Sequence, residues 1–518
     1  MVYFTGNSFY DMENQNENHP LAKAFPIIIL VFILLVRLSF LGKGMIAIPD
    51  EVRYLHTVLA LGDLLRHNIS GFWFNIFATQ GRPGDGIIRL ISALLQVILF
   101  PNVSGENQRS LVIPTIINVF ISLLVLLLFY RITLRLFPKC RSFAYAGTII
   151  YALLVNNNLY LRHILPYDTA LLINLFAFYL ALTRRPTNKL FSCIGFLEGV
   201  GFTVYPGYYY FPVIVLFTLL YRLKIIPSIR KKVVLLLWYL FFALSPLVFF
   251  EIAARGISRS YILESRDLIG TITQGSYKEV FTFFISYLIY VEKFIGIFLL
   301  FIIALYFIKI VYVFLVKRQF HLVDGIMVVS FLGYASYVVA AYFSHSVLYG
   351  RLLHIYFPFL IWGALRFIDG MPLSVRSILI TTFLLCSLVS FGQFYEAFLK
   401  IDYPRDILYS YGVDTNFLSG SDFVFESNVL RKIDSSSSWD SRTNYPYKKG
   451  NYVLVNFGYF YSFSDSYRPF IPGKDLMLVY KNNHFLSFSP YMFEGFSIRE
   501  RQILEERKYE MKIYKKVL

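Results

Sequence analysis

Long runs of apolar residues recur along the chain, separated by short polar loops. A helix needs about 20 apolar residues to cross the hydrocarbon core of a bilayer. The runs that approach this length predict eleven membrane-spanning helices, at about residues 24–42, 111–131, 143–160, 167–183, 190–205, 207–222, 233–253, 294–316, 323–343, 352–368 and 377–395. Two amphipathic stretches, 51–67 and 87–100, are too polar or too short to cross. We expect them to lie along the membrane interface.

Basic residues indicate which loops face the cytoplasm. With the N-terminus inside, each short loop assigned to the cytoplasm is basic and nearly free of acid, as in the run 230–232. Loops assigned to the outside carry mixed charge, as the positive-inside rule requires. The alternation holds through all eleven spans, and a crossing at 87–100 would break it. The first outer loop then covers 43–110, and a second long one covers 254–293.

The C-terminal region has a different pattern. Residues 396–518 are more polar, with strand-like runs at 452–455 and 476–480 and a helical pattern at 497–506. We therefore expect a cytoplasmic polar tail (1–23), a transmembrane domain (24–395) and a small mixed α/β extracytoplasmic domain (396–518). The predicted fold class is a polytopic α-helical membrane protein with interfacial helices in its first outer loop.

Composition excludes several classes of protein. The chain is 57% hydrophobic, whereas soluble proteins average about 45–50% apolar residues. Its net charge of +17 comes from short basic clusters between apolar runs, so we expect no nucleic-acid partner. Cys140, Cys193 and Cys386 lie in or beside hydrophobic segments without metal-ligand spacing. The partners that this composition predicts are membrane lipids.

Two adjacent carboxylates follow the first span. Asp50 and Glu51 stand within the sequence Ile-Pro-Asp-Glu-Val-Arg-Tyr at 48–54, where a membrane helix has just reached water. Charged groups are costly there unless solvated or paired. One interpretation is a carboxylate that removes a proton from an acceptor hydroxyl. The alternative is an acidic N-cap for the following helix, which explains one acid better than two.

The sequence Pro-Asp-Glu-X-Arg-Tyr at 49–54 resembles membrane glycosyltransferases of the GT-C superfamily, in particular the branch of protein O-mannosyltransferases and lipid A aminoarabinose transferases. The resemblance covers about residues 25–395. Its further motifs are 81–84, 108–110, Arg162-His163, Tyr167-Asp168 and 349–351 with His354 and Pro358. The chain departs from the family pattern in two places, because 81–84 lacks a second proline and 349–351 reverses the order of aromatic residue and arginine.

This resemblance implies an inverting transfer of a sugar from a polyprenyl-phosphate donor to a hydroxyl acceptor at the outer face of the membrane. Asp50 would act as the base, and Glu51 would position the acceptor or the base. A departing lipid phosphate gains charge, so arginines should gather around it. The candidate substrate-binding residues are Arg53, Arg82, Arg162, His163, Asp168, Tyr349, Arg351 and His354.

Other interpretations of the same residues remain open. Each arginine can instead contact lipid headgroups or extend its charge to the interface. His163, His354 and Asp168 could hold a divalent cation, but we expect no metal ion or other cofactor to be required. Arg37 and Glu198 are ionisable residues within predicted spans, for which a structural contact is the alternative to a functional one.

The alternative function is a transporter or flippase for a lipid-linked glycan, which should show repeated halves and charges near the midplane. A scaffold protein whose outer domain binds a partner is a third possibility. For the enzyme, the acceptor is a glycolipid, a polysaccharide or a protein. The expected location is the bacterial inner (cell) membrane, with the active site on the extracytoplasmic side.

Overall fold

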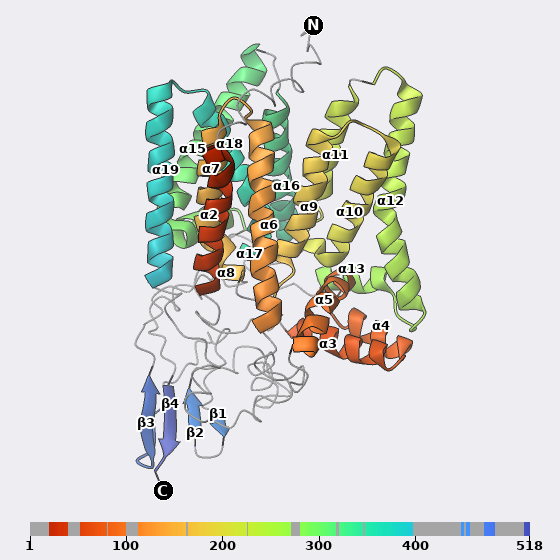
Figure 1. Ribbon diagram of the computed structural model, residues 1–518, viewed down its shortest axis with the longest axis vertical. Coiled ribbons are helices and arrows are strands. Elements are labelled where there is room, and N and C mark those ends of the chain that lie inside the picture. Colours follow the sequence, from red (N-terminus) through yellow and green to blue (C-terminus); the bar gives the residue numbers. More distant parts are fainter. Residues whose placement is uncertain are drawn as a thin grey trace.

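The chain is helical throughout most of its described length (Figure 1). The computed structural model describes residues 20–39, 52–79, 81–99, 112–161, 164–224, 226–270, 280–317, 321–344, 348–396, 447–449, 452–455, 471–481 and 512–517. The predicted helix at 497–506 lies outside these ranges.

A bundle of helices occupies the positions of the predicted spans. The long helices are α2 (Pro20–Ser39), α6 (Val112–Leu136), α12 (Ile229–Arg255), α15 (Lys293–Tyr312), α16 (Leu322–Ser344) and α19 (Leu373–Phe394). The shorter ones are α7 (Arg141–Leu153), α8 (Val155–Tyr160), α9 (Tyr167–Thr183), α10 (Asn188–Val204), α11 (Phe211–Leu223), α17 (Gly350–Leu353) and α18 (Phe357–Asp369). Short segments join them: η3 (Pro206–Tyr208), α14 (Phe283–Tyr287), and the π-helical turns η5 (Leu288–Glu292) and η6 (Val313–Lys317).

In the described part of the chain, five helices are long and apolar enough to cross a membrane. They cover Ile113–Leu136, Ile229–Arg255, Lys293–Val316, Leu322–Phe343 and Leu373–Phe394. Shorter apolar helices include Ile27–Ser39 and Tyr167–Thr183. The protein is therefore a helical membrane protein, and the number of eleven crossings stays a prediction.

Two of the predicted spans are broken rather than continuous. The segment 143–160 divides at Leu154, whose backbone is extended (φ −57°, ψ 136°), into α7 and α8. The segment 352–368 divides between α17 and α18, and Pro358 occupies the first turn of α18. Proline lacks an N–H and fits only the first turn of a helix, so a helix that contains Pro358 must begin just before it.

Three helices follow the first span before the bundle resumes: α3 (Val52–Leu65), α4 (Ile69–Phe77) and α5 (Pro83–Leu99). The first and third match the stretches predicted as interfacial. The second was not predicted, although Asn68 caps it by accepting a hydrogen bond from the N–H of Gly71 at 3.0 Å. Figure 1 shows α3 and α4 lying across one end of the bundle, close to α13 (Tyr261–Gly270).

The C-terminal region contributes a small antiparallel sheet. Its strands are β1 (Tyr447–Lys449), β2 (Tyr452–Val455), β3 (Leu476–Lys481) and β4 (Lys512–Lys516), in the order β1-β2-β4-β3. An irregularity in register falls between Leu478 and Tyr480. The two runs predicted as strands are strands β2 and β3. Figure 1 draws the sheet beyond the end of the bundle that α3 and α4 cover.

Helices α10 and α12 pack closely because glycines line their contact. A Cβ added at Gly195 would collide with the carbonyl oxygen of Tyr239, and one at Gly199 with that of Ala243. Small residues allow backbones to approach closely, which is a common basis of helix association in membranes. At these two glycines the helices are too close for an added methyl group.

We therefore expect Gly199→Ala to lower stability by about 1–3 kcal/mol, because the new methyl group must displace backbone. Gly392→Ala is the matched control, since no atom lies within 4 Å of a Cβ at that helical position. That change should be neutral or stabilising by up to about 1 kcal/mol. Thermal unfolding of the detergent-solubilised variants checks both. Equal melting temperatures for the two variants would contradict the close packing.

Candidate functional site

The break between α7 and α8 creates free backbone N–H groups inside the protein. The carboxylate of Glu292, at the end of η5, accepts hydrogen bonds from the N–H of Val155 at 2.9 Å and of Asn156 at 2.8 Å. Glu292 is fully buried, and the next residue, Lys293, has a positive φ of 51°. This conformation is unfavourable for a residue with a side chain. The strained residue, Lys293, therefore directly follows Glu292, whose carboxylate caps α8.

Burial controls the ionisation of Glu292, which precedes the candidate span Lys293–Val316. Removal from water disfavours the charged form, whereas the two backbone N–H donors favour it. Burial is the larger effect and raises the pKa of Glu292 from 4.5 to about 7. The carboxyl group therefore titrates near neutral pH.

Asn156 links this cap to a buried histidine. Its Nδ2 donates to the hydroxyl of Tyr287 at 2.5 Å and to the carbonyl oxygen of Gly350 at 3.2 Å. Its Oδ1 lies 2.8 Å from Nδ1 of His354. On the other side of the ring, Nε2 lies 3.0 Å from Oδ1 of Asp168. His354 and Asp168, both predicted as site residues, are therefore direct partners.

Two arginines near the start of α9 contact tyrosine side chains. Arg351 donates to the hydroxyl of Tyr167 at 3.1 Å, and its guanidinium carbon lies 4.3 Å from the ring centre of Tyr349. The guanidinium carbon of Arg82 lies 4.8 Å from the ring centre of Tyr205. The rings of Tyr205 and Tyr167 meet edge to face, with centroids 4.9 Å apart. The two guanidinium groups are thus connected by a pair of tyrosines.

Arg82 is buried yet incompletely paired. Its exposed fraction is 6%, and within the described residues its Nε and one terminal nitrogen have no hydrogen-bond partner. Each buried donor without a partner costs free energy. A guanidinium group with unused donors is suited to binding an anion.

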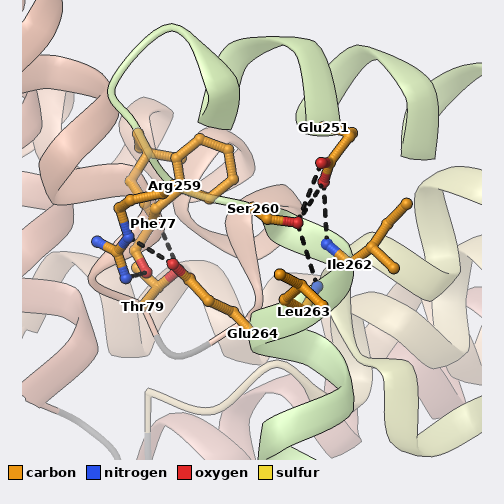
Figure 2. Close-up of polar contacts among 9 residues, drawn as sticks. Phe77, Thr79, Glu251, Arg259, Ser260, Ile262, Leu263 and Glu264 are labelled. Carbon is orange, nitrogen blue, oxygen red and sulfur yellow. Dashed lines mark hydrogen bonds and ion pairs between the residues drawn. The ribbon is translucent and has the colours of Figure 1, made fainter.

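The end of α4, five residues before Arg82, is held by contacts from another part of the chain. Gly81 has a positive φ of 72°, which glycine adopts without strain. Figure 2 shows Arg259 beside Phe77, the last residue of α4. Arg259 donates to Glu264 at 2.5 Å and to the carbonyl oxygen of Phe77 at 3.5 Å. The end of α4 is joined in this way to α13 and to the segment between α12 and α13.

The helix that carries Glu264 is also capped from outside itself. The carboxylate of Glu251, in α12, accepts from the hydroxyl of Ser260 and from the N–H of Ile262 at 3.0 Å (Figure 2). The first N–H groups of a helix lack partners within it, so this carboxylate satisfies the start of α13. The start of α13 is thereby fixed against the end of α12.

Arg37 also belongs to the buried cluster. It donates to the hydroxyl of Ser122 at 2.5 Å and interacts electrostatically with Asp168 and Tyr151. Glu198 has a different environment: within the described residues neither of its carboxyl oxygens has a hydrogen-bond partner. Of the two ions predicted within spans, only Arg37 has a described interaction with the cluster.

The described members of the predicted site come together in a connected set of contacts. They are Arg82, Asp168, Tyr349, Arg351 and His354. Asp50, Glu51, Arg162 and His163 lie outside the described residues. Arg53 lies in α3, and its side chain is outside the description. The described part of the chain holds no group of three or more His, Cys, Asp or Glu arranged around a metal position.

Sequence reasoning missed Asn156, Tyr287 and the capping role of Glu292. A signal was present in the run Asn156-Asn157-Asn158, because three amides within a predicted span require buried partners. The acid that satisfies this segment is 136 residues away in the chain.

Comparison with known proteins adds no relative: no family model, no curated protein and no solved structure matches this chain.

The pKa of Glu292 makes stability depend on pH. A raised pKa means that the folded protein binds the proton more tightly than the unfolded chain. The stabilisation is complete below pH 4.5 and is lost as the pH rises through about 7. Relative to Glu292→Gln, which cannot ionise, the wild type should lose up to about 3 kcal/mol over this range. Thermal unfolding measured between pH 4.5 and about 7 tests this pH dependence. Asp475→Asn, which removes an exposed carboxylate, is the control. If the stabilities of the wild type and Glu292→Gln change in parallel with pH, the prediction is wrong.

Proposed function

We propose that this protein is an integral-membrane glycosyltransferase. It transfers a sugar from a polyprenyl-phosphate donor to a hydroxyl acceptor at the outer face of the membrane. The observation that carries the proposal is the convergence of Arg82 and Arg351 on the Tyr205–Tyr167 pair, beside the contact between Asp168 and His354. These residues come from separate segments of the chain, and the sequence resemblance selected five of them individually.

The arginines suit a phosphate leaving group. During transfer, the bond between the sugar carbon and the phosphate oxygen breaks, and the phosphate departs with the electron pair. Its negative charge grows, so guanidinium groups stabilise the transition state more than the bound donor. The unused donors of Arg82 supply hydrogen bonds for this purpose.

The base in this proposal is Asp50. Its carboxylate takes the proton of the acceptor hydroxyl while the hydroxyl oxygen bonds to the sugar carbon on the face opposite the phosphate. Glu51 positions the acceptor or the base, and Arg53 adds a further cation. Tyr54 donates to Gln96 of α5 at 2.7 Å, so α3, which follows Asp50 and Glu51, packs against the helix that follows Arg82.

Arg162 and His163 complete the donor side. They directly precede the segment that leads to Tyr167 and Asp168 at the start of α9. A guanidinium and an imidazole at this point of the chain can hydrogen-bond the phosphate or the acceptor. The proposed reaction requires no metal ion, because the arginines supply the positive charge.

The proposed membrane arrangement has eleven crossings, and the active site faces away from the cytoplasm, at the bacterial inner membrane. α3 and α5 lie in the outer interface, and residues 396–518 form an extracytoplasmic domain that contains the sheet. Figure 1 supports this arrangement: α3, α4 and α13, which the charge pattern assigns to one side, lie at one end of the bundle. The acceptor is a glycolipid, a polysaccharide or a protein.

Replacing the proposed base tests the reaction. In proteoliposomes supplied with labelled polyprenyl-phosphate sugars, Asp50→Asn should reduce transfer by about 10²–10⁴-fold, because the amide cannot accept the proton. Asp63→Asn is the control, since it removes another carboxylate of the same outer loop. Full activity in Asp50→Asn would remove the proposed mechanism. Movement of the labelled lipid across the bilayer without a new glycosidic bond would indicate a flippase instead.

Replacing a donor-side arginine separates donor binding from acceptor binding. Arg351→Ala should raise the KM for the donor at least tenfold and leave the KM for the acceptor nearly unchanged, because a charge-assisted bond to phosphate is worth about 1.5–3 kcal/mol. Arg255→Ala is the control, since the side chain of Arg255 is 66% exposed and, among the described residues, forms its ion pair with Glu251 of its own helix. Equal effects on donor and acceptor would assign Arg351 a structural role.

A further inference from the structure

We propose that His354 is held as an imidazolium, with Asn156 and Asp168 fixing one proton on each ring nitrogen. The imidazolium cancels the charge of Asp168 on the side of the site that the arginines face. Asn156 is then a positioning residue. The proton assignment rests on hydrogen-bond geometry and on the basicity of imidazole, and the consequence for catalysis rests on the proposed function.

The orientation of the Asn156 amide is set by its other partners. The carbonyl oxygen of Gly350, 3.2 Å from the amide, can only accept a hydrogen bond. The nitrogen of the amide must therefore point to Gly350, and the hydroxyl of Tyr287 lies on the same side at 2.5 Å. The amide oxygen consequently faces His354, and Nδ1 of the ring must carry a proton to donate to it.

The opposite ring nitrogen then faces an acceptor. A neutral imidazole protonated on Nδ1 would present a lone pair from Nε2 to the carboxyl group of Asp168, 3.0 Å away. Two acceptors at this distance repel each other unless a proton lies between them. His354 is completely buried, so no contact with bulk solvent relieves the repulsion. The pair therefore retains one proton more than a neutral imidazole beside a carboxylate.

The shared proton stays on the ring, because imidazole is a stronger base than a carboxylate. Arg37, which interacts electrostatically with Asp168, places a further cation beside the pair. Within the described residues, the other titratable groups near the pair are four phenols, one guanidinium and one carboxyl group. They are Tyr151, Tyr167, Tyr208, Tyr287, Arg351 and, through the capped backbone of Asn156, Glu292. Neutral phenols do not compete for the charge of Asp168.

This arrangement has a consequence for an anionic donor. An uncompensated carboxylate next to Tyr167 would repel the phosphate that Arg351 is proposed to bind. With Arg37 and the imidazolium together opposing one carboxylate, the local charge is positive. The site therefore accepts an anion, although it contains an acid.

Nitrogen-15 NMR of histidine-labelled full-length protein in lipid tests the proton assignment without any measurement of activity. A variant in which the other seven of the eight histidines are glutamine makes His354 the only signal. At neutral pH, both ring nitrogens should resonate at the position of protonated nitrogen. A signal from one unprotonated nitrogen would overturn the proposal.

Two substitutions should produce opposite tautomers. Asp168→Asn can donate its amide N–H to Nε2, so the ring should become neutral with its proton on Nδ1. Asn156→Leu removes the acceptor from Nδ1, so the ring should become neutral with its proton on Nε2. Asn157→Leu is the control, since its amide donates to Tyr151 and not to His354. Unchanged spectra in both test variants would overturn the proposal, and thermal unfolding identifies any variant that has lost its fold.

The functional consequence is measured separately. Asn156→Leu should raise the KM for the donor roughly tenfold, through loss of one positive charge near the phosphate, while Asn157→Leu should not. If the NMR spectra show the imidazolium but transfer is absent in the wild type, the glycosyltransferase proposal fails and the proton assignment stands. If transfer occurs and the ring is neutral, only the assignment fails.

Discussion

The two hydrogen bonds that Glu292 accepts from Val155 and Asn156 determine the rest of the site. A helix that stops inside an apolar bundle leaves backbone N–H groups unsatisfied, and each of them costs free energy. The carboxylate removes that cost and fixes the first turn of α8. Asn156 is part of that turn, so its amide is placed against His354, and His354 against the start of α9.

A second set of contacts lies at the end of α4, the helix that precedes Arg82 in the chain. Glu251 and Arg259 fix the corner between α12, α13 and α4, and the chain turns from this corner to Arg82. Arg351 directly follows Gly350, which belongs to the buried network of Glu292 and Asn156, whereas the contacts of Glu251 and Arg259 are partly exposed. The tyrosine pair connects the two guanidinium groups. A displacement in either set of contacts would move one arginine relative to the other, so the site depends on both.

The sequence predicted the helices well because their signal is local. Apolar runs and basic loops need only short windows, and helices occur at every predicted span. The break at Leu154 was missed because strongly apolar neighbours outweigh three asparagines in any average over a window. The helix α4 was missed because its single capping residue, Asn68, is a weak signal. The partnership of Asp168 with His354 could not be predicted, since 186 residues separate them and only the folded bundle brings them together.

The energetics of the cluster support a functional origin for its polar groups. Replacing a buried ionic network with apolar side chains of similar size is often neutral or stabilising, so stability alone does not explain its presence. Arg82 strengthens the point, because its buried nitrogens without partners in the described part of the chain impose a cost that a leucine would not. A bound anion would remove that cost by accepting the hydrogen bonds. The same side chain that lowers the stability of the protein alone would then strengthen a complex with an anion, which is consistent with the proposed role of Arg82 in binding the donor phosphate.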